Sequence, residues 1–237
     1  MSVHLILTAK LLPISSPEHI IDGKYNLSRD SLPRIDRYKR CIDTALEYCG
    51  PHNITPFVVY ADSYKRTREL FVSHGYEKYT TTWIKNKSQT FFLPDNAFSK
   101  YKYASELNSV QQVLSMSDIP DNDMIIKQVG RLCACDDAFY QQVTCASNQD
   151  KDAVVFMYDK EKRHPDNSMC FHGIIAMKKK HWMALHVPNE TPISSAEYAK
   201  HIASFIKEKM AKEKIVMVQH VSLECSPSHN PNELYYI

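Results

Sequence analysis

Glycine is scarce in this chain, with 5 residues among 237. No G-x-G-x-x-G or G-x-x-x-x-G-K-S/T string occurs, so the glycine-rich loops that hold phosphates through backbone amides are absent from the sequence. The low glycine content also excludes collagen-like and glycine-rich low-complexity architectures. Any phosphate that this protein binds must therefore be held by side chains, by a metal ion or by a helix N-terminus.

A strong net charge is missing as well. The chain has 29 Lys and Arg against 27 Asp and Glu, which leaves a formal net charge of +2. No strong field draws it toward nucleic acid or an acidic membrane, and we expect no nucleic-acid partner. Apolar runs are only of strand length; the run at 3–7 is followed closely by Lys10. We therefore expect no transmembrane segment and no signal peptide.

The seven cysteines are scattered, and none forms a C-x-x-C pair. An odd number without paired spacing argues against a disulfide scaffold and a zinc ribbon. A reducing compartment suits such a chain, so we predict a cytoplasmic location. The chain is 43% hydrophobic and 24% charged, which is the range of globular domains, and its length predicts one domain over 1–237.

Short apolar runs alternate with longer amphipathic stretches along the chain. The predicted strands are 3–7, 57–60, 79–84, 124–129, 153–158, 169–177 and 215–223. The predicted helices are 35–48, 65–74, 101–116, 136–144 and 196–214, with a helix-like stretch at 178–185. Loops are predicted at 13–33 and 86–98, and a polar tail at 226–237. The alternation predicts an α/β domain with a mainly parallel central sheet and helices on both faces.

Ligands of open α/β sheets bind outside the carboxyl ends of the strands, so the residues that follow predicted strands are the candidate site. These residues, together with one carboxylate that opens the C-terminal helix, are Thr8, Lys10, Asp62, Arg131, Asp136, Asp137, Asp159, His172 and Glu197. The set combines carboxylates, cations and one histidine, and it lacks a glycine-rich cradle for phosphate.

Two cations lie in or after the predicted strand 124–129. Lys127 lies inside an apolar run, where a lone ammonium is costly to bury. Arg131 follows a glycine at the end of that strand, and the fork of its guanidinium suits phosphate. Each cation either meets a phosphate of the ligand or forms a structural salt bridge with a neighbouring carboxylate.

The acidic candidates also have two interpretations each. Asp136 and Asp137 either contact a metal ion or the ligand, or they cap the helix that follows. Glu197 either acts as a general base or stabilises the first turn of its helix. Two literal D-x-D strings, at 121–123 and 150–152, precede strands and so lie at the wrong end of the sheet for a ligand.

The remaining candidates follow the same logic. His172 is either a core histidine or a ligand of a metal or diphosphate. Thr8 and Asp62 end the first two strands, where a carboxylate accepts hydrogen bonds from ribose hydroxyls or simply forms a turn. Asp159 and Asp166, which follow the strand 153–158, are the other carboxylates to test as the general base, and Asp159 joins Glu197 as a catalytic candidate.

The segment 123–132, D-M-I-I-K-Q-V-G-R-L, resembles the D-x-x-I-x-K-x-T-G-R-Y stretch of small sugar-nucleotide glycosyltransferases. These enzymes occur in bacterial capsule and lipopolysaccharide loci and in large DNA viruses of algae and protists. Val129 stands where the family has Thr, and Leu132 where it has Tyr. The segment 170–178 is similar to the family's F-x-x-x-x-M-K stretch, and 195–197 is similar to its S-x-E at a helix start.

The resemblance implies a GT-A fold, a Rossmann-like sheet with a nucleotide-binding half at roughly 1–135 and an acceptor half at roughly 136–225. It implies a nucleotide-diphosphate sugar as donor, with a UDP-sugar favoured, and a glycan hydroxyl as acceptor. A divalent metal, Mn²⁺ or Mg²⁺, is also implied. A viral source would place the protein in the host cytoplasm.

With these roles, Lys127 and Arg131 would stabilise the leaving diphosphate, and Asp136 or Asp137 would hold the metal. Glu197 would deprotonate the acceptor in an inverting displacement. Two alternatives stay open. A nucleotidyltransferase would normally carry a Gly-rich, Lys-containing loop after the first strand, and Thr8-Ala-Lys-Leu-Leu-Pro13 has no glycine. A non-catalytic module that binds nucleotide or glycan is the other alternative.

Overall fold

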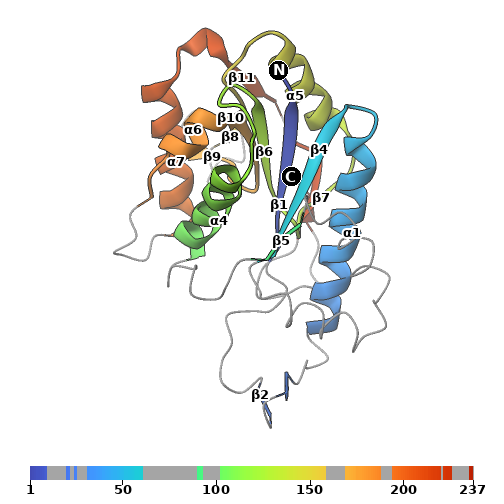
Figure 1. The fold of residues 1–237 in the computed structure, drawn as a ribbon. Helices are drawn as coiled ribbons and strands as arrows, with labels where there is room; N and C mark the ends of the chain where they lie inside the picture. Colours follow the sequence, from blue (N-terminus) through green and yellow to red (C-terminus); the bar gives the residue numbers. More distant parts are fainter. Residues whose placement is uncertain are drawn as a thin grey trace.

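The computed structural model describes residues 1–9, 20–21, 24–25, 31–60, 90–92, 102–158, 169–187, 194–219, 221–225 and 235–236. Its centre is a large sheet whose strands follow the order β11-β8-β10-β6-β1-β4-β5, with β9 paired to β8 (Figure 1). The strands are β1 (Val3–Ala9), β4 (Ile54–Tyr60), β5 (Thr90–Phe92), β6 (Met124–Val129), β8 (Ala153–Tyr158), β9 (Met169–Cys170), β10 (Ile174–Lys178) and β11 (Ile215–Val218).

The sheet is mainly parallel. β1 pairs in parallel with β4 on one side and with β6 on the other, β4 pairs in parallel with β5, and β11 in parallel with β8. β10 is antiparallel to both of its neighbours, β6 and β8. The carboxyl ends of β1, β4, β6 and β8 therefore meet at one edge of the sheet, called the carboxyl edge below. The opposite edge is the amino edge.

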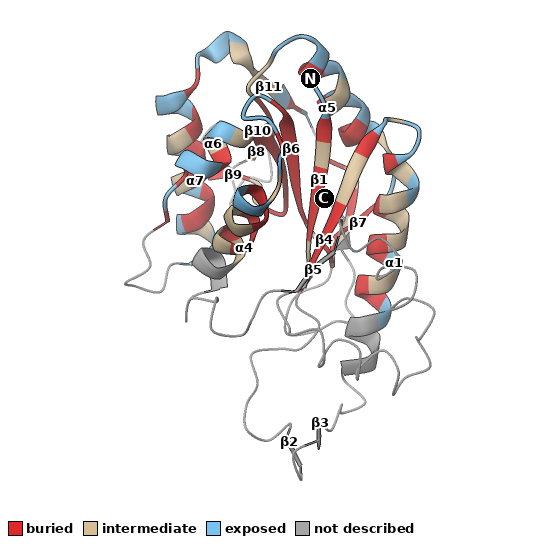
Figure 2. Cartoon of the chain, viewed as in Figure 1, coloured by how far each residue is buried: buried red, intermediate tan, exposed pale blue. Residues whose placement is uncertain are grey.

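Helices cover both faces of this sheet (Figure 1). They are α1 (Ser31–Cys49) and α5 (Ala138–Asn148) on one face, and α4 (Lys102–Met116), α6 (Lys179–Ala184) and α7 (Ser195–Lys209) on the other. The side chains of β1 alternate accordingly: Leu5 and Leu7 pack toward α1 and α5, and Ile6 packs toward α4. Most residues of β1, β6 and β10 are buried, because both faces of the sheet are covered (Figure 2).

Smaller strands lie outside the main sheet. A second sheet has the order β13-β12-β7, formed by β7 (Cys133–Ala134), β12 (Leu223–Cys225) and β13 (Tyr235–Tyr236). β7 packs against α1. A separate pair is formed by β2 (Ile20–Ile21) and β3 (Lys24–Tyr25), and a short 3-10 helix, η3 (Lys212–Lys214), precedes β11. Within the described parts of the chain, none of the helices has both the length and the apolar character needed to cross a lipid bilayer.

The predicted α/β class with helices on both faces is confirmed. The strands at 124–129 and 153–158 are found with the predicted bounds, and the helix predicted at 101–116 is α4. The strand predicted at 169–177 is wrong as one element, because a turn at 171–173 divides it into β9 and β10. The strand predicted at 215–223 is likewise two strands, β11 and β12, in different sheets.

Other predictions differ or are not described. β5 and β7 were not predicted, and β5 lies in the predicted loop 86–98. The helix at 65–74 and the strand at 79–84 lie outside the described residues.

Candidate functional site

The strand order reverses between β1 and β6. From β1 the chain continues to β4 and β5 on one side, and it then crosses over to β6 on the other side of β1. In open α/β sheets ligands bind outside the carboxyl ends of the strands at such a reversal, because the connections from the two strands leave toward opposite faces of the sheet. Thr8, near the end of β1, and the turn 129–132, after β6, border this point. We call it the switch point.

Gly130 joins the two strands at the switch point. Its amide donates a 2.9 Å hydrogen bond to the carbonyl oxygen of Thr8. A Cβ atom on Gly130 would lie 3.2 Å from that same oxygen and 3.3 Å from Cδ1 of Tyr38. Close packing against β1 and α1 therefore favours glycine here. The hydroxyl of Thr8 lies 3.5 Å from the carbonyl oxygen of Gln128, at the outer limit of a hydrogen bond.

Arg131 follows this glycine with a half-buried side chain. Its guanidinium makes no hydrogen bond or ion pair with any residue that the structure describes, whereas its carbonyl oxygen accepts a 3.0 Å hydrogen bond from Nε of Arg37. Arg37 itself is 8% exposed and fully engaged, since it also donates to the carbonyl oxygen of Glu224 at 3.0 Å and pairs with the Glu224 carboxylate at 3.3 Å. Arg37 is therefore held by described residues, whereas the guanidinium of Arg131, at the switch point, has no partner among them.

A buried glutamine holds the other end of the turn 129–132. Gln128 is fully buried, and its Nε2 donates a 2.8 Å hydrogen bond to the carbonyl oxygen of Leu132. Its Oε1 accepts a 2.5 Å hydrogen bond from the hydroxyl of Tyr140 on α5. Sequence reasoning missed Gln128, Arg37 and Glu224. Gln128 could have been noticed in the sequence, because a polar Gln inside an apolar strand is expected to be buried and a buried amide must find hydrogen-bond partners.

The predicted donor ligand Lys127 is engaged in the protein interior. It is 2% exposed, and its ammonium pairs with the carboxylate of Glu106 on α4. It also donates a 2.7 Å hydrogen bond to the carbonyl oxygen of His172. Of the two interpretations of Lys127, these contacts favour the structural salt bridge.

His172 lies in the turn between β9 and β10, next to the switch point. The amide of Val129 donates a 2.9 Å hydrogen bond to the carbonyl oxygen of Gly173, which fixes this turn beside the end of β6. The imidazole ring packs edge-on against the ring of Tyr198 in the first turn of α7, with centroids 5.2 Å apart. The structure therefore brings Thr8, Arg131 and His172 to the same edge of the sheet.

Glu197 caps α7. Ser194 and Glu197 form a capping box, in which the Ser194 amide donates to Oε2 of Glu197 at 2.6 Å and the Glu197 amide donates to Oγ of Ser194 at 3.2 Å. The hydrogen bond from the Ser194 backbone, followed by that from its side chain, lowers the pKa of Glu197. A carboxylate with a lowered pKa is a weaker base, so these contacts favour the structural interpretation over the general base.

Asp136 and Asp137 do not lie at the carboxyl edge, where the sequence placed them. Asp137 pairs through Oδ2 with Nε2 of His52 at 2.8 Å, and His52 lies in the turn before β4, at the amino edge. Asp136 accepts a 3.1 Å hydrogen bond from the amide of Ala138, at the first turn of α5. After β6 the chain forms β7 along α1, and this carries the two carboxylates away from the switch point.

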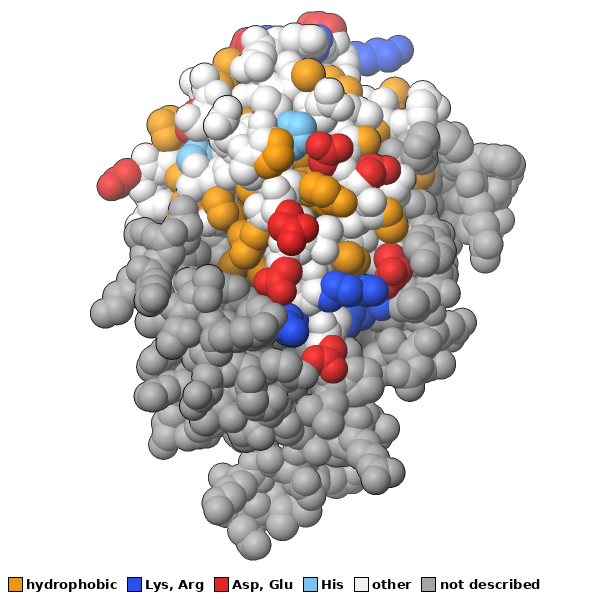
Figure 3. Space-filling model, turned by 90° about the vertical axis from the view of Figure 1, so that its right-hand side faces the viewer, with side chains coloured by type: hydrophobic (Ala, Val, Ile, Leu, Met, Phe, Trp, Pro, Cys, Tyr) orange, Lys and Arg blue, Asp and Glu red, His pale blue; other side chains and the backbone are white. Residues whose placement is uncertain are grey.

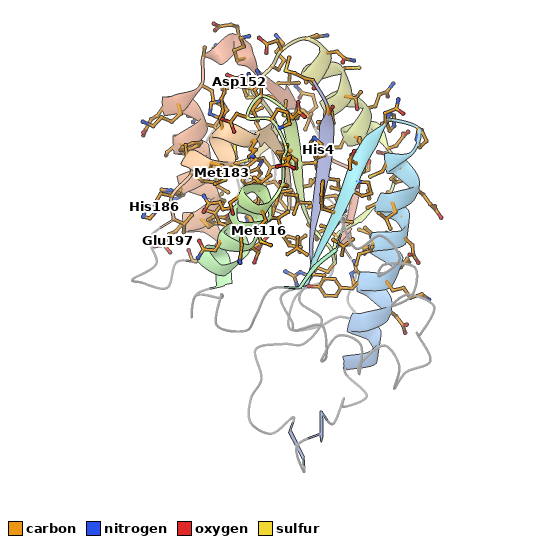
Figure 4. The ribbon with its side chains drawn as sticks, in the orientation of Figure 1. His4, Met116, Asp152, Met183, His186 and Glu197 are labelled. Carbon is orange, nitrogen blue, oxygen red and sulfur yellow. The ribbon has the colours of Figure 1, made fainter. Side chains whose placement is uncertain are left out.

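The two D-x-D strings lie at the amino edge, as predicted. Asp123 accepts hydrogen bonds from the Ser2 amide at 3.1 Å and from His4, whose Nε2 lies 3.0 Å away. Asp150 and Asp152 both pair with Lys178. Figure 4 shows Asp152 near the top of the view and Glu197 lower down, at the left, so the two carboxylates lie well apart.

No cluster of three or more His, Cys, Asp or Glu side chains that fits a metal ion occurs among the described residues. The other predicted site residues Lys10, Asp62 and Asp159, together with Asp166, lie outside the described part of the chain. The predicted metal site therefore stays a prediction.

Comparisons with known proteins add a likeness of fold. No protein-family model matches the chain, and no curated protein matches it in sequence. Among solved structures, it is similar to the crystal structure of 4-diphosphocytidyl-2C-methyl-D-erythritol synthase from Anaerococcus prevotii DSM 20548. The TM-score is 0.48 and the identity 12%, over 92% of this chain and 88% of that chain. A likeness at this level carries no argument about function.

Proposed function

We propose that this protein is a transferase that binds a nucleotide-diphosphate sugar at the switch point and moves the sugar to a hydroxyl of a glycan. The observation that carries the proposal is the guanidinium of Arg131, which lies where the strand order reverses and has no partner among the described residues. A guanidinium binds the oxygens of a diphosphate through paired hydrogen bonds, and a switch point is where α/β sheets bind nucleotides.

The backbone around Arg131 is held in advance of any ligand. Three hydrogen bonds fix the turn: Gly130 to Thr8, Arg37 to the Arg131 carbonyl, and Gln128 to the Leu132 carbonyl. Because the turn is already ordered, binding orders only the Arg131 side chain and loses little entropy there. A side chain at 130 would press on the Thr8 carbonyl and on the Tyr38 ring, so the glycine lets the turn lie close to β1 and α1.

In this proposal Arg131 has one chemical role. Transfer of the sugar leaves negative charge on the diphosphate, and a fixed guanidinium beside it stabilises that charge in the transition state. Lys127 acts at a distance, since its hydrogen bond to His172 positions the turn before β10. The resemblance of the segment 123–132 to sugar-nucleotide glycosyltransferases supports the same assignment for Arg131. Asp136 and Asp137, the predicted metal ligands, contact the Ala138 amide and His52, away from the switch point.

A module that binds nucleotide or glycan without turnover is the second candidate. The capping box favours it, because the carboxylate of Glu197, the predicted base, is engaged by Ser194 and its pKa is lowered. This candidate would bind its ligand at the same site as the transferase but would not transfer the sugar.

Thermal unfolding with UDP-, GDP-, dTDP- and CMP-sugars tests binding. A ligand at a hundred times its Kd stabilises the folded state by about 2.7 kcal/mol, which raises Tm by roughly 5–10 °C in a chain of this size. We expect a shift with one nucleotide, lost in Arg131→Ala and only partly kept in Arg131→Lys. Lys212→Ala, which removes an exposed cation beside the amino edge, is the control and should keep the shift.

Three outcomes separate the candidates. A shift that Arg131→Ala abolishes, followed by release of nucleotide diphosphate in the presence of a glycan, supports the transferase. The same shift without turnover on any glycan supports the binding module. No shift with any nucleotide sugar, or a shift that Arg131→Ala leaves intact, overturns the proposed site.

A further inference from the structure

Two consecutive residues of β6 carry buried polar side chains to opposite faces of the sheet. Lys127 reaches α4 and the turn before β10. Gln128, which is fully buried, reaches Tyr140 on α5 and the carbonyl oxygen of Leu132. Each side chain therefore joins a side chain of a covering helix to a backbone carbonyl in a turn at the carboxyl edge.

Core packing alone does not explain the amide of Gln128. The preceding residues on the same face of β6, Met124 and Ile126, are apolar and are fully buried in the core beside α1 and α5. A buried amide is costly unless it is hydrogen-bonded, and an aliphatic side chain would fill the same position without that cost. The amide of Gln128 is hydrogen-bonded at both ends, and one of these bonds ends in the turn 129–132, which carries Arg131.

The hydroxyl of Tyr140 fixes the direction in which the amide of Gln128 points. It donates to Oε1 at 2.5 Å, so that Nε2 donates to the Leu132 carbonyl at 2.8 Å. A deprotonated phenol oxygen would accept from Nε2 instead and would turn the amide over. Burial raises the pKa of Tyr140 well above its usual 10, so the hydroxyl keeps its proton at neutral pH and remains the donor.

The turn 129–132 is closed by a 2.9 Å hydrogen bond from the amide of its last residue to the carbonyl oxygen of its first. The carbonyl of Arg131, the third residue of the turn, is held by Arg37, and Gln128 holds the carbonyl of the residue that follows. Two successive peptide planes are thus fixed. With them is fixed the direction in which the side chain of Arg131 leaves the backbone.

We propose that Tyr140 is a positioning residue of the candidate site, which acts through Gln128 on the turn that carries Arg131. Tyr140 touches no ligand. Its hydroxyl orients the Gln128 amide, and this amide holds the turn in the form in which the guanidinium meets a diphosphate. The effect on the turn follows from the hydrogen bonds alone, whereas the effect on a ligand rests on the proposed function.

Both members of the pair can be changed without altering the outer surface, because Tyr140 and Gln128 are fully buried. Figure 3, which views the molecule from the side of α1, shows Lys and Arg side chains gathered in one place among acidic ones. These charges stay the same when the pair is substituted. A change in ligand binding in such variants therefore comes from the interior and not from surface charge.

Hydrogen exchange followed by NMR measures the turn directly and needs no ligand. The amides of Gly130 and Leu132 are both hydrogen-bonded, to the end of β1 and within the turn. In Tyr140→Phe we expect both amides to exchange about ten times faster, which is the effect of losing one hydrogen bond. The amide of Ile126, in the middle of β6, is the reference that reports any change in global stability.

Tyr48→Phe is the matched control. The ring of Tyr48, on α1, lies 5.7 Å from the ring of Tyr140, so this variant also removes a phenol hydroxyl between α1 and α5. It leaves both hydrogen bonds of the Gln128 amide in place. The exchange rates of the turn should therefore equal those of the wild type.

The double variant Tyr140→Phe, Gln128→Met separates positioning from simple stabilisation. Tyr140→Phe alone leaves Oε1 of Gln128 buried without a donor, which lowers Tm. Gln128→Met replaces the second polar partner with an apolar side chain of similar length, and removing both partners is often nearly neutral for stability. We expect the double variant to melt no lower than Tyr140→Phe. Its turn should still exchange at least as fast, because the Leu132 carbonyl has lost its donor.

Isothermal titration with UDP and with inorganic pyrophosphate extends the test to the ligand. Tyr140→Phe and the double variant should bind both probes about three- to tenfold more weakly, whereas Tyr48→Phe should bind them as the wild type does. If neither probe binds the wild type, the proposed function fails, and the exchange rates alone decide whether Tyr140 holds the turn. Unchanged exchange of the turn in Tyr140→Phe overturns the positioning role. A turn that loosens with no loss of affinity for a probe that the wild type binds overturns it as well.

Discussion

The ammonium of Lys127 lies 2.7 Å from the carbonyl oxygen of His172 and joins the middle of β6 to the turn that precedes β10. The same ammonium pairs with Glu106 on α4. One buried cation thus ties together a parallel strand, the turn before the antiparallel strand and a covering helix. The three elements border the carboxyl edge, so the shape of the candidate site depends on this residue even though Lys127 is 2% exposed.

Lys127→Met should destabilise the protein strongly. The change keeps the length of the side chain but leaves the carboxylate of Glu106, whose side chain is 13% exposed, without its cation. Removing one partner of a buried ion pair costs about 3–5 kcal/mol, because the remaining charge is left unpaired in the low-dielectric interior. Urea unfolding followed by circular dichroism measures the loss in the free energy of unfolding.

The double variant Lys127→Met, Glu106→Gln distinguishes the energy of the ion pair from the effect of changing the side-chain volume. We expect it to be more stable than Lys127→Met alone, with a coupling of about 1–3 kcal/mol between the two positions. If Lys127→Met lies within about 0.5 kcal/mol of the wild type, the pair does not exist in solution as the structure has it.

Arg37→Met should also destabilise the protein, and it should disturb nucleotide binding if the proposed site is correct. Its guanidinium donates hydrogen bonds to the carbonyl oxygens of Arg131 and Glu224 and pairs with the Glu224 carboxylate. A buried acceptor left without a hydrogen bond costs about 1–3 kcal/mol. We expect a loss of about 3 kcal/mol in the free energy of unfolding. Arg40→Met is the matched control: Arg40 pairs with the same carboxylate from a half-exposed position, and a loss below about 1 kcal/mol is expected. Equal losses in the two variants would contradict the assigned contacts.

The sequence predicts those elements whose signal is local. The runs 124–129 and 153–158 are continuous apolar stretches between polar turns, and they are β6 and β8 with the same bounds. The serine cap before α7 was also predictable, because the spacing of Ser194 and Glu197 is that of a capping box. The two interpretations of Glu197 could be stated from the sequence, and only the contact with the Ser194 amide favours one of them.

What the sequence could not predict depends on distant partners. The direction of β10 is a tertiary property, since the run 169–177 looks the same in a parallel and in an antiparallel strand. β5 has three residues and no periodicity of its own, and its pairing with β4 is what makes it a strand. Asp137 was misplaced for the same reason: β7 exists only through α1 and β12, and it carries Asp137 to His52.

The capping box makes a prediction about Glu197 that differs from that of a general base. Ser194→Ala should cost about 1 kcal/mol in the free energy of unfolding, because α7 loses its N-cap. Glu197→Gln should also destabilise the protein at neutral pH. If the protein turns over a nucleotide sugar, this variant should keep most of that turnover. A Glu197→Gln variant with unchanged stability and no turnover would instead support the catalytic interpretation. Thermal unfolding and a nucleotide-release assay measure the two properties.

The amino edge carries a charge network whose pH dependence has a defined sign. Hydrogen bonds from Lys178 and Lys214, followed by their charges, hold the pKa of Asp150 well below its ordinary 3.8. Burial opposes the charge on Lys178, but hydrogen bonds to Asp150 and Asp152 outweigh it and raise its pKa above 10.5. The stability that Asp150 contributes is thus present above about pH 4 and lost as the pH falls through the lowered pKa, and that of Lys178 is lost only as the pH rises through the raised one.

Asp150→Asn should therefore lower Tm by a constant amount between about pH 5 and pH 9, and the difference from the wild type should shrink below pH 4. Burial is the main cause of the lowered pKa of His181, and titration of His181 also makes Tm depend on pH. This dependence is common to the wild type and Asp150→Asn, so the difference in Tm between them at each pH removes it. Lys178→Met, which strips Asp152 of a cation in a partly buried place, should cost about 2 kcal/mol, or roughly 4–8 °C in Tm. A difference between wild type and Asp150→Asn that grows toward acid would show that Asp150 is protonated in the folded protein. The network would then not hold the charges that these contacts require.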